Sequence, residues 1–126
     1  MEEEQQRTLM HYITAYNNFD IAGMAEHLDE NIVFENISNG QKNLRTDGLT
    51  AFIEQAEMAK NYFKQREQSV TSWAFEKDKV TVDIAYKGIL NVDLPNGLKV
   101  GETLILQGQS EFEFLEGRII SIRDIS

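Results

Sequence analysis

Apolar and polar residues follow two different patterns along this chain, and the pattern changes near Glu67. Before that residue, apolar side chains recur at intervals of three or four, which places them on one face of a helix. After it, apolar and polar residues alternate, which places the apolar ones on one face of a strand. The sequence therefore predicts mainly helix in the first half and mainly β-sheet in the second.

Three helices are expected in the first half. The first covers about residues 3–18, and the second begins after Asp20, whose carboxylate can cap it. Thr46 or Asp47 can cap the third, whose apolar residues continue to Phe63. The apolar stripe of the first helix consists of Leu9, Tyr12, Ile13 and Tyr16.

Five strands are expected, one between the second and third helices and four after the third. The first is the short segment 32–36, and the polar stretch 38–47 after it is expected to be an exposed loop. Hairpins join the other four strands, and in the first hairpin Phe75 should pair with Val80. Three helices packed on one face of a strongly curved antiparallel sheet make the predicted class α+β.

The strand expected over residues 101–114 is the longest element of the predicted sheet. One of its faces is apolar except for Ser110, and the other face is largely polar. At roughly 3.3 Å per residue this strand is too long to stay flat in a small domain. Gly108 stands in its middle, where a glycine commonly marks a bulge or a bend. We therefore expect a curved sheet that surrounds a hollow.

Composition narrows the classes of function. The 126 residues suit a single domain over residues 1–126, and the net charge of −9 argues against binding to nucleic acid or to an anionic membrane surface. The absence of cysteine excludes disulfides and thiolate nucleophiles. No signal peptide is visible, and no apolar run approaches the ~20 residues that cross a bilayer, so a cytoplasmic protein is expected.

The order of elements resembles the nuclear transport factor 2-like superfamily, and two stretches carry the resemblance most specifically. These are residues 12–36 and the closing hairpin at residues 112–119. The small-molecule branches of the superfamily include ketosteroid isomerases and SnoaL-like polyketide cyclases. The resemblance implies a cone-shaped fold and a homodimer formed through the outer face of the sheet.

Three residues can be compared with the ketosteroid isomerases one at a time. Tyr12 stands where those enzymes place the phenol that donates a hydrogen bond to the developing enolate. Asn36 stands in place of their proton-abstracting carboxylate, and Ser110 in place of their protonated acid. An amide cannot accept a proton at neutral pH, so this route of steroid isomerisation is not expected.

A mostly apolar pocket for a small apolar or carbonyl-containing ligand is expected inside the curve of the sheet. Most of the aromatic residues expected to line this pocket could instead be ordinary residues of the protein core. Asn36 and Ser110 are harder to explain as core, because inward polar groups need hydrogen-bond partners. The candidate ligand-binding residues are Tyr16, Phe34, Asn36, Phe52, Met58, Trp73, Tyr86, Ser110, Phe112 and Ile122.

Asp124 is the candidate catalytic base, with Tyr12 as its partner, and its orientation depends on the last hairpin. A two-residue turn would pair Phe114 with Ile119 and turn Arg123 inward, which favours an anionic ligand. A three-residue loop with a bulge would turn Ile120, Ile122 and Asp124 inward. We favour the bulged form, because it adds two isoleucines to the apolar wall and because SnoaL-like cyclases use a carboxylate from this part of the sheet.

No metal site or cofactor is expected. His11 and His27 lie beside the helix stripes, and neither has a second ligand at a spacing typical of metal sites. Two hypotheses remain for the function. One is an isomerase, cyclase or hydrolase that uses acid–base chemistry, and the other is a noncatalytic ligand-binding or dimerisation module.

Overall fold

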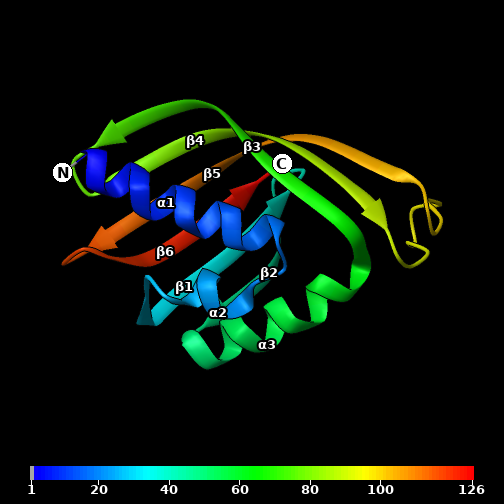
Figure 1. The fold of residues 1–126 in the computed structure, drawn as a ribbon, viewed down its shortest axis with the longest axis horizontal. Coiled ribbons are helices and arrows are strands. Elements are labelled where there is room, and N and C mark those ends of the chain that lie inside the picture. Colours follow the sequence, from blue (N-terminus) through cyan, green and yellow to red (C-terminus); the bar gives the residue numbers. More distant parts are fainter. Residues whose placement is uncertain (1) are drawn as a thin grey trace.

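The computed structural model describes residues 2–126, which form an α+β fold with three helices and six strands (Figure 1). The helices are α1 (Glu2–Asn17), α2 (Ile21–Ala25) and α3 (Leu49–Ala59), and a short 3₁₀ helix, η1 (Lys60–Tyr62), follows α3. The strands are β1 (Leu28–Ser38), β2 (Gln41–Asp47), β3 (Phe63–Glu76), β4 (Lys79–Leu90), β5 (Thr103–Leu115) and β6 (Arg118–Ile125). The predicted class and the number of helices are confirmed.

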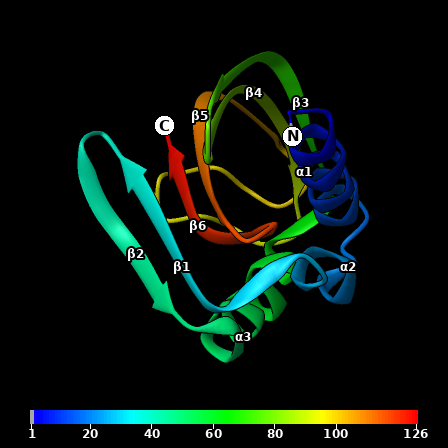
Figure 2. The same ribbon diagram turned by 90° about the vertical axis from the view of Figure 1, so that its left-hand side faces the viewer.

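One sheet contains all six strands, in the order β2-β1-β6-β5-β4-β3. Neighbouring strands are antiparallel except β1 and β6, which run parallel, so the sheet is mixed rather than purely antiparallel. Figure 2 shows the sheet curling around the interior, with α1 beside β3 and α3 next to β1 and β2. Within residues 2–126, no helix has the length and apolar character that crossing a membrane requires.

The helices form where the apolar stripes predict them, but one cap differs. The carboxylate of Asp20 accepts a hydrogen bond from the backbone N–H of Gly23 and so caps α2. Helix α3 begins after Gly48, whose φ of 91° lies in the left-handed region, so neither Thr46 nor Asp47 caps it. Both of those residues belong to β2 instead.

The expected loop at residues 38–47 is wrong, because most of it is strand β2. This strand pairs with β1 across a turn at Asn39 and Gly40, both of which have positive φ. It lies at the edge of the sheet and is mostly exposed, so its residues do not show the apolar alternation of a half-buried strand. The expected extension of the third helix to Phe63 is also wrong, since that residue begins β3.

The hairpins after β3 follow the predicted pairing, with Phe75 opposite Val80. Gly108 does not mark a bulge, because the pairing of β4 with β5 runs through it without a register shift. A Cβ atom added at this glycine would lie 2.8 Å from the carbonyl oxygen of Ile125. Its role is therefore to let the end of β6 come close to β5, next to Asp124.

Candidate functional site

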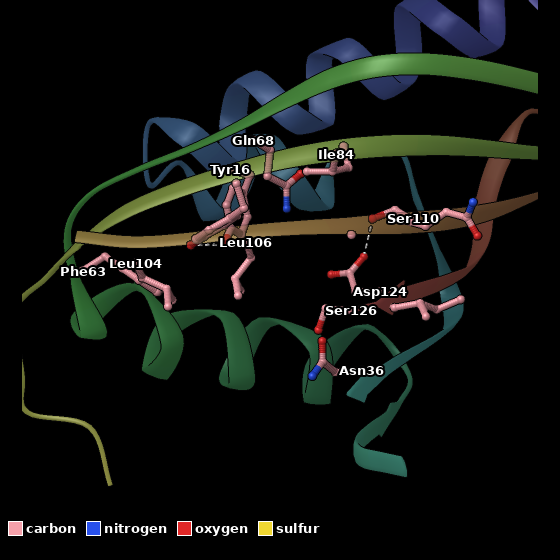
Figure 3. Close-up of a pocket in the computed structure, with 14 residues that line it drawn as sticks. Tyr16, Asn36, Phe63, Gln68, Ile84, Leu104, Leu106, Ser110, Asp124 and Ser126 are labelled. Carbon is pink, nitrogen blue, oxygen red and sulfur yellow. Dashed lines mark hydrogen bonds between the residues drawn. The ribbon is translucent and has the colours of Figure 1, made fainter. Parts of the chain in front are cut away.

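Two adjoining cavities lie inside the curve of the sheet. The larger, of about 340 Å³, lies over β4, β5 and the end of β6 and is called the sheet cavity here. The smaller, of about 190 Å³, lies among the three helices, β1 and β2 and is called the helix cavity. Tyr16, Asn36 and Asp124 border both, so they mark the place where the two cavities meet. Figure 3 shows Asp124 at the sheet cavity, beneath Ser110.

The inward orientation of Asp124 results from a bulge in β6. The last hairpin has a two-residue turn, with Phe114 opposite Ile119, so the favoured three-residue loop is wrong. The register then shifts between Glu113 and Phe114, which leaves Ile120 as the extra residue of β6. Beyond this bulge Ser110 pairs with Asp124, and that carboxylate faces the cavities.

The bulge also decides which isoleucines are buried. Ile119 and Ile122 are fully buried, whereas Ile120, which was expected to face inward, is partly exposed. Because the extra residue follows Ile119, Ile122 and Asp124 face inward even though the turn has only two residues. The turn is thus that of the first expected alternative, and the inward direction of Ile122 and Asp124 is that of the second.

Asp124 is surrounded by protein but can be reached from the cavities. Its Oδ1 accepts a hydrogen bond of 2.7 Å from the Ser110 hydroxyl. Burial raises the pKa of the Asp124 carboxyl to about 6, although the hydrogen bond from Ser110 opposes the rise. At neutral pH this group is mostly ionised, yet it binds a proton far more readily than an ordinary aspartate does. Such a pKa suits a general base.

Three tyrosines stand near Asp124. The hydroxyls of Tyr16 and Tyr86 lie 2.9 Å apart and share a hydrogen bond, and the ring of Tyr12 meets Phe112 edge to face. Burial raises the pKa of each of the three phenols above the ordinary value, and the charge of Asp124 adds to this effect. All three phenols therefore keep their protons at neutral pH and can act as hydrogen-bond donors.

Asn36 and Ser110 both border the sheet cavity, as expected, but Tyr12 borders only the helix cavity. The three strands β5, β6 and β1 place Ser110, Asp124 and Asn36 side by side, since each pairs with the next across the sheet. The amide of Asn36 also donates a hydrogen bond to the Asn43 side chain at 2.9 Å. The polar residues that the sequence singles out are thus gathered around one carboxylate.

Of the remaining predicted ligand-binding residues, three line a cavity. Phe34 and Phe52 border the helix cavity and contact each other edge to face, with ring centroids 5.8 Å apart. Tyr86 borders the sheet cavity. Their placement agrees with an apolar wall, whereas their role in binding stays a prediction.

Four of the predicted ligand-binding residues line neither cavity. Met58 lies on α3 and is 58% exposed. Trp73 stacks on Phe75 along β3, with the two rings nearly parallel. Phe112 and Ile122 are fully buried, because core side chains pack against this end of the sheet and leave no space there.

Arg66 is a cavity residue that the sequence pattern does not predict. It lies on β3, is only 5% exposed and borders the helix cavity. The alternating pattern becomes visible at Glu67, one residue after it, whereas β3 begins at Phe63. Simple alternation from Trp73 would place Arg66 on the outer face, but a bulge at Thr71 reverses the alternation and turns Arg66 inward.

The two histidines lie together, which their spacing in the sequence does not indicate. Their rings meet edge to face with centroids 5.0 Å apart, and the side-chain ligand atoms of His11, Glu26 and His27 lie within 4.8 Å of one another. His11 comes from α1, whereas the other two residues lie between α2 and β1. The spacing of these residues in the sequence does not indicate this grouping, and none of the three borders the two cavities.

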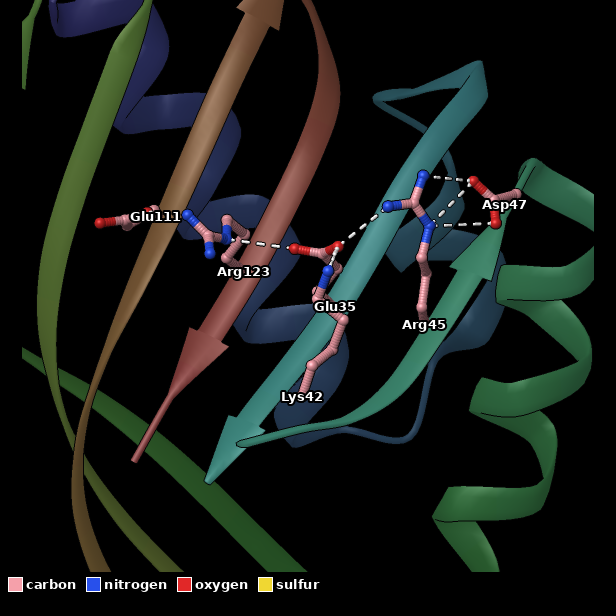
Figure 4. Close-up of polar contacts among 6 residues, drawn as sticks. All are labelled: Glu35, Lys42, Arg45, Asp47, Glu111 and Arg123. Carbon is pink, nitrogen blue, oxygen red and sulfur yellow. Dashed lines mark hydrogen bonds and ion pairs between the residues drawn. The ribbon is translucent and has the colours of Figure 1, made fainter. Parts of the chain in front are cut away.

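The outer face of the sheet carries a cluster of ion pairs around Glu35 (Figure 4). Its carboxylate lies 2.7 Å from Lys42, 3.0 Å from Arg45 and 3.2 Å from Arg123. The hydrogen bond from Lys42 lowers the pKa of Glu35, and the charges of the three cations lower it further. Because Arg123 faces outward in this cluster, the alternative in which it turns toward the pocket is wrong.

Comparison with protein families identifies the chain. Residues 9–122 match the model of the SnoaL-like domain, which is most of the sequence. The chain belongs to the SnoaL-like domain family. Among curated proteins, no match was found. The predicted SnoaL-like domain and its nuclear transport factor 2-like fold are confirmed.

Solved structures show the same fold at low sequence identity. A candidate polyketide cyclase from Xanthomonas campestris has a TM-score of 0.83 and 16% identity, over 98% of this chain and 90% of that one. TerC, co-crystallised with polyporic acid, has a TM-score of 0.77 and 14% identity, over 97% and 90%. A protein with a ketosteroid isomerase-like fold from Catenulispora acidiphila, in complex with trimethylamine, has a TM-score of 0.75 and 10% identity, over 93% of this chain and 82% of that one. Two of these three structures with the same fold were solved with a small molecule.

Proposed function

We propose that this SnoaL-like domain catalyses a proton transfer on a small carbonyl compound, with Asp124 as the general base. The observation that carries the proposal is a carboxylate with a raised pKa at the junction of two cavities. A group of this kind, enclosed by protein and open to a ligand site, is typical of acid–base catalysts. The family match supports a small molecule as the ligand.

In the proposed reaction, Asp124 removes a proton from the carbon next to a carbonyl group. The electron pair of the broken C–H bond moves to the carbonyl oxygen and forms an enolate, which a hydrogen bond from Tyr12 stabilises. Ser110 holds the Oδ1 atom of the carboxylate, which leaves Oδ2 to accept the proton. If the enolate is conjugated with a carbon–carbon double bond, return of the proton from Asp124 to another carbon completes an isomerisation. If the enolate instead attacks a second carbonyl group, the oxygen of that group takes up the proton from Asp124, which completes a cyclisation.

The cavity linings favour a ligand with a large apolar part. Phe34 and Phe52 line the helix cavity, and Leu104 and Leu106 line the sheet cavity. Such walls bind hydrocarbon by removing its surface from water, whereas the few polar groups fix its orientation. Tyr16 and Asn36, at the junction, would contact a ligand in either cavity.

Deuterium exchange on 2-tetralone tests the proposal, because this bicyclic ketone has acidic protons next to its carbonyl group. We expect the protein in D₂O to accelerate exchange above the buffer rate, and the rate to rise as the pH passes through about 6, where Asp124 ionises. Asp124→Asn should reduce the acceleration by at least roughly a hundredfold. Glu113→Gln, which removes a carboxylate from the opposite face of β5, should have no effect.

The noncatalytic hypothesis is supported by Asn36 and Ser110, which stand where ketosteroid isomerases have carboxyl groups. The same experiment distinguishes the two hypotheses. If 2-tetralone binds but exchanges at the buffer rate, or if Asp124→Asn exchanges it as fast as the natural protein does, Asp124 is not a base. The domain would then be a ligand-binding module.

A further inference from the structure

Arg66 is a buried cation that this chain does not neutralise. It is only 5% exposed, and within residues 2–126 no carboxylate lies within ion-pair distance of its guanidinium group. Its Nη2 atom is buried and has no hydrogen-bond partner among the described residues. Buried charges in proteins are normally paired, since removal from water is costly. The site is therefore incomplete in the protein alone.

The contacts of Arg66 within the protein satisfy only part of the hydrogen-bonding capacity of its guanidinium group. Its Nε atom donates a hydrogen bond of 2.8 Å to the carbonyl oxygen of Tyr16, near the end of α1. The guanidinium carbon lies 3.7 Å from the centre of the Tyr16 ring and 4.6 Å from that of Phe19. A cation is favourable at the C-terminal end of a helix. These contacts hold the group in place, yet they supply no anionic partner.

The position of Arg66 connects this charge with the proposed site. Arg66 borders the helix cavity, together with Tyr12 and Asp124. Its positive charge acts on the phenols there: burial raises the pKa of Tyr12 and Tyr16, and the charge of Arg66 opposes that rise. The cavity thus has a basic group on one wall and a fixed positive charge on another.

We propose that Arg66 binds an anionic oxygen of the ligand, such as a carboxylate, in the helix cavity. This inference rests on the proposed function, because it assigns a second functional group to the same ligand. The ligand would then be a carbonyl compound with an apolar body and an acidic group. Arginine suits this task, since its planar guanidinium can donate two parallel hydrogen bonds to a carboxylate.

Binding of 2-naphthoate and 2-naphthamide, measured by calorimetry near neutral pH, tests the inference without requiring turnover. The two probes have nearly the same shape, and only the first is charged. We expect the natural protein to bind the naphthoate at least roughly tenfold more tightly, because a hydrogen bond to a charged group is the stronger kind. Arg66→Gln should abolish this preference, and Arg66→Lys should retain part of it.

Arg123→Gln is the matched control, because it removes an arginine from the outer face of the same sheet and should leave the preference unchanged. A thermal melt of each variant shows whether it is folded, and if Arg66→Gln does not fold, the natural protein and Arg66→Lys decide. Equal binding of the two probes, a preference that persists in Arg66→Gln, or no binding of the naphthoate at millimolar concentration would overturn the inference. The exchange of uncharged 2-tetralone is a separate measurement, so either proposal can fail alone.

Discussion

At the scale of single residues, the burial of Asp124 lowers the free energy of unfolding by an amount that depends on pH. Its folded-state pKa of about 6 lies above the ordinary value of 3.8, so between these values the folded protein holds a proton that the unfolded chain has lost. Stability must therefore fall as the pH rises through this range. Above about pH 6 the carboxyl group is ionised in both the folded and the unfolded protein, and the folded protein then bears the whole free-energy cost of burying the charge.

Replacing Asp124 with Asn should remove this cost, because the amide is uncharged and can still accept the hydrogen bond from Ser110. We expect the variant to be more stable than the natural protein by about 3 kcal/mol at about pH 8 and to show little of that advantage at about pH 3.5. Urea unfolding at the two pH values measures the difference. An advantage of the same size at both values would mean that the Asp124 charge is not its cause.

At the scale of helices and strands, the cluster around Glu35 joins β1 to its two neighbours. Lys42 and Arg45 reach this carboxylate from β2, and Arg123 reaches it from β6. These long side chains, rather than the protein interior, cover Glu35, so its charge remains favourable. The cluster helps to hold the edge strand β2, which has few apolar contacts of its own.

Glu35→Gln should destabilise the protein with the opposite dependence on pH. The folded-state pKa of Glu35 lies below its ordinary value of 4.5, so its contribution is present above that pH and is lost as the pH falls through the lowered pKa. Urea unfolding should show a loss at neutral pH that shrinks in acid and also shrinks when salt is added. A loss that changes with neither pH nor salt would point to packing instead.

The sequence predicts elements well where an apolar face is buried and poorly where it is not. Strands β4 and β5 are recognisable because apolar and polar residues alternate along them, whereas the exposed strand β2 has no such pattern. The feature of the sequence that indicates β2 is the Asn39-Gly40 pair, because Asn-Gly strongly favours a hairpin turn. The pairing of His11 with His27 depends on tertiary packing, which a pattern along the chain does not contain.

The orientation of Asp124 could not be predicted from the sequence alone. The sequence indicates Asp124 as a candidate, but two hairpin registers fit the alternation equally well, and the structure combines features of both. Ile119 and Ile120 are equally apolar, so their identity does not reveal which one is the extra residue of the bulge. Arg66 was not predicted because the bulge at Thr71 reverses the alternation within β3, and the sequence does not mark that bulge.

At the scale of the whole molecule, the homodimer implied by the resemblance stays a prediction. Ile105 is 68% exposed on the outer face of the sheet, beside Lys87 of the neighbouring strand. If that face joins two copies, sedimentation should give the mass of two chains, and Ile105→Lys should give the mass of one. Gln107→Lys, which adds the same charge two residues along this face, shows whether charge alone causes dissociation. A single-chain mass for the natural protein would contradict the prediction.

The central claim is that the curved sheet holds the Asp124 carboxyl group inside the molecule as a proton acceptor. Titration of the Asp124 side-chain carbon by NMR, with Asp124→Asn to assign the signal, tests it most directly. We predict an apparent pKa of about 6, which should rise further in Ser110→Ala because the opposing hydrogen bond is lost. A pKa at or below 3.8, the ordinary value, would contradict both the burial of the group and its role as the base.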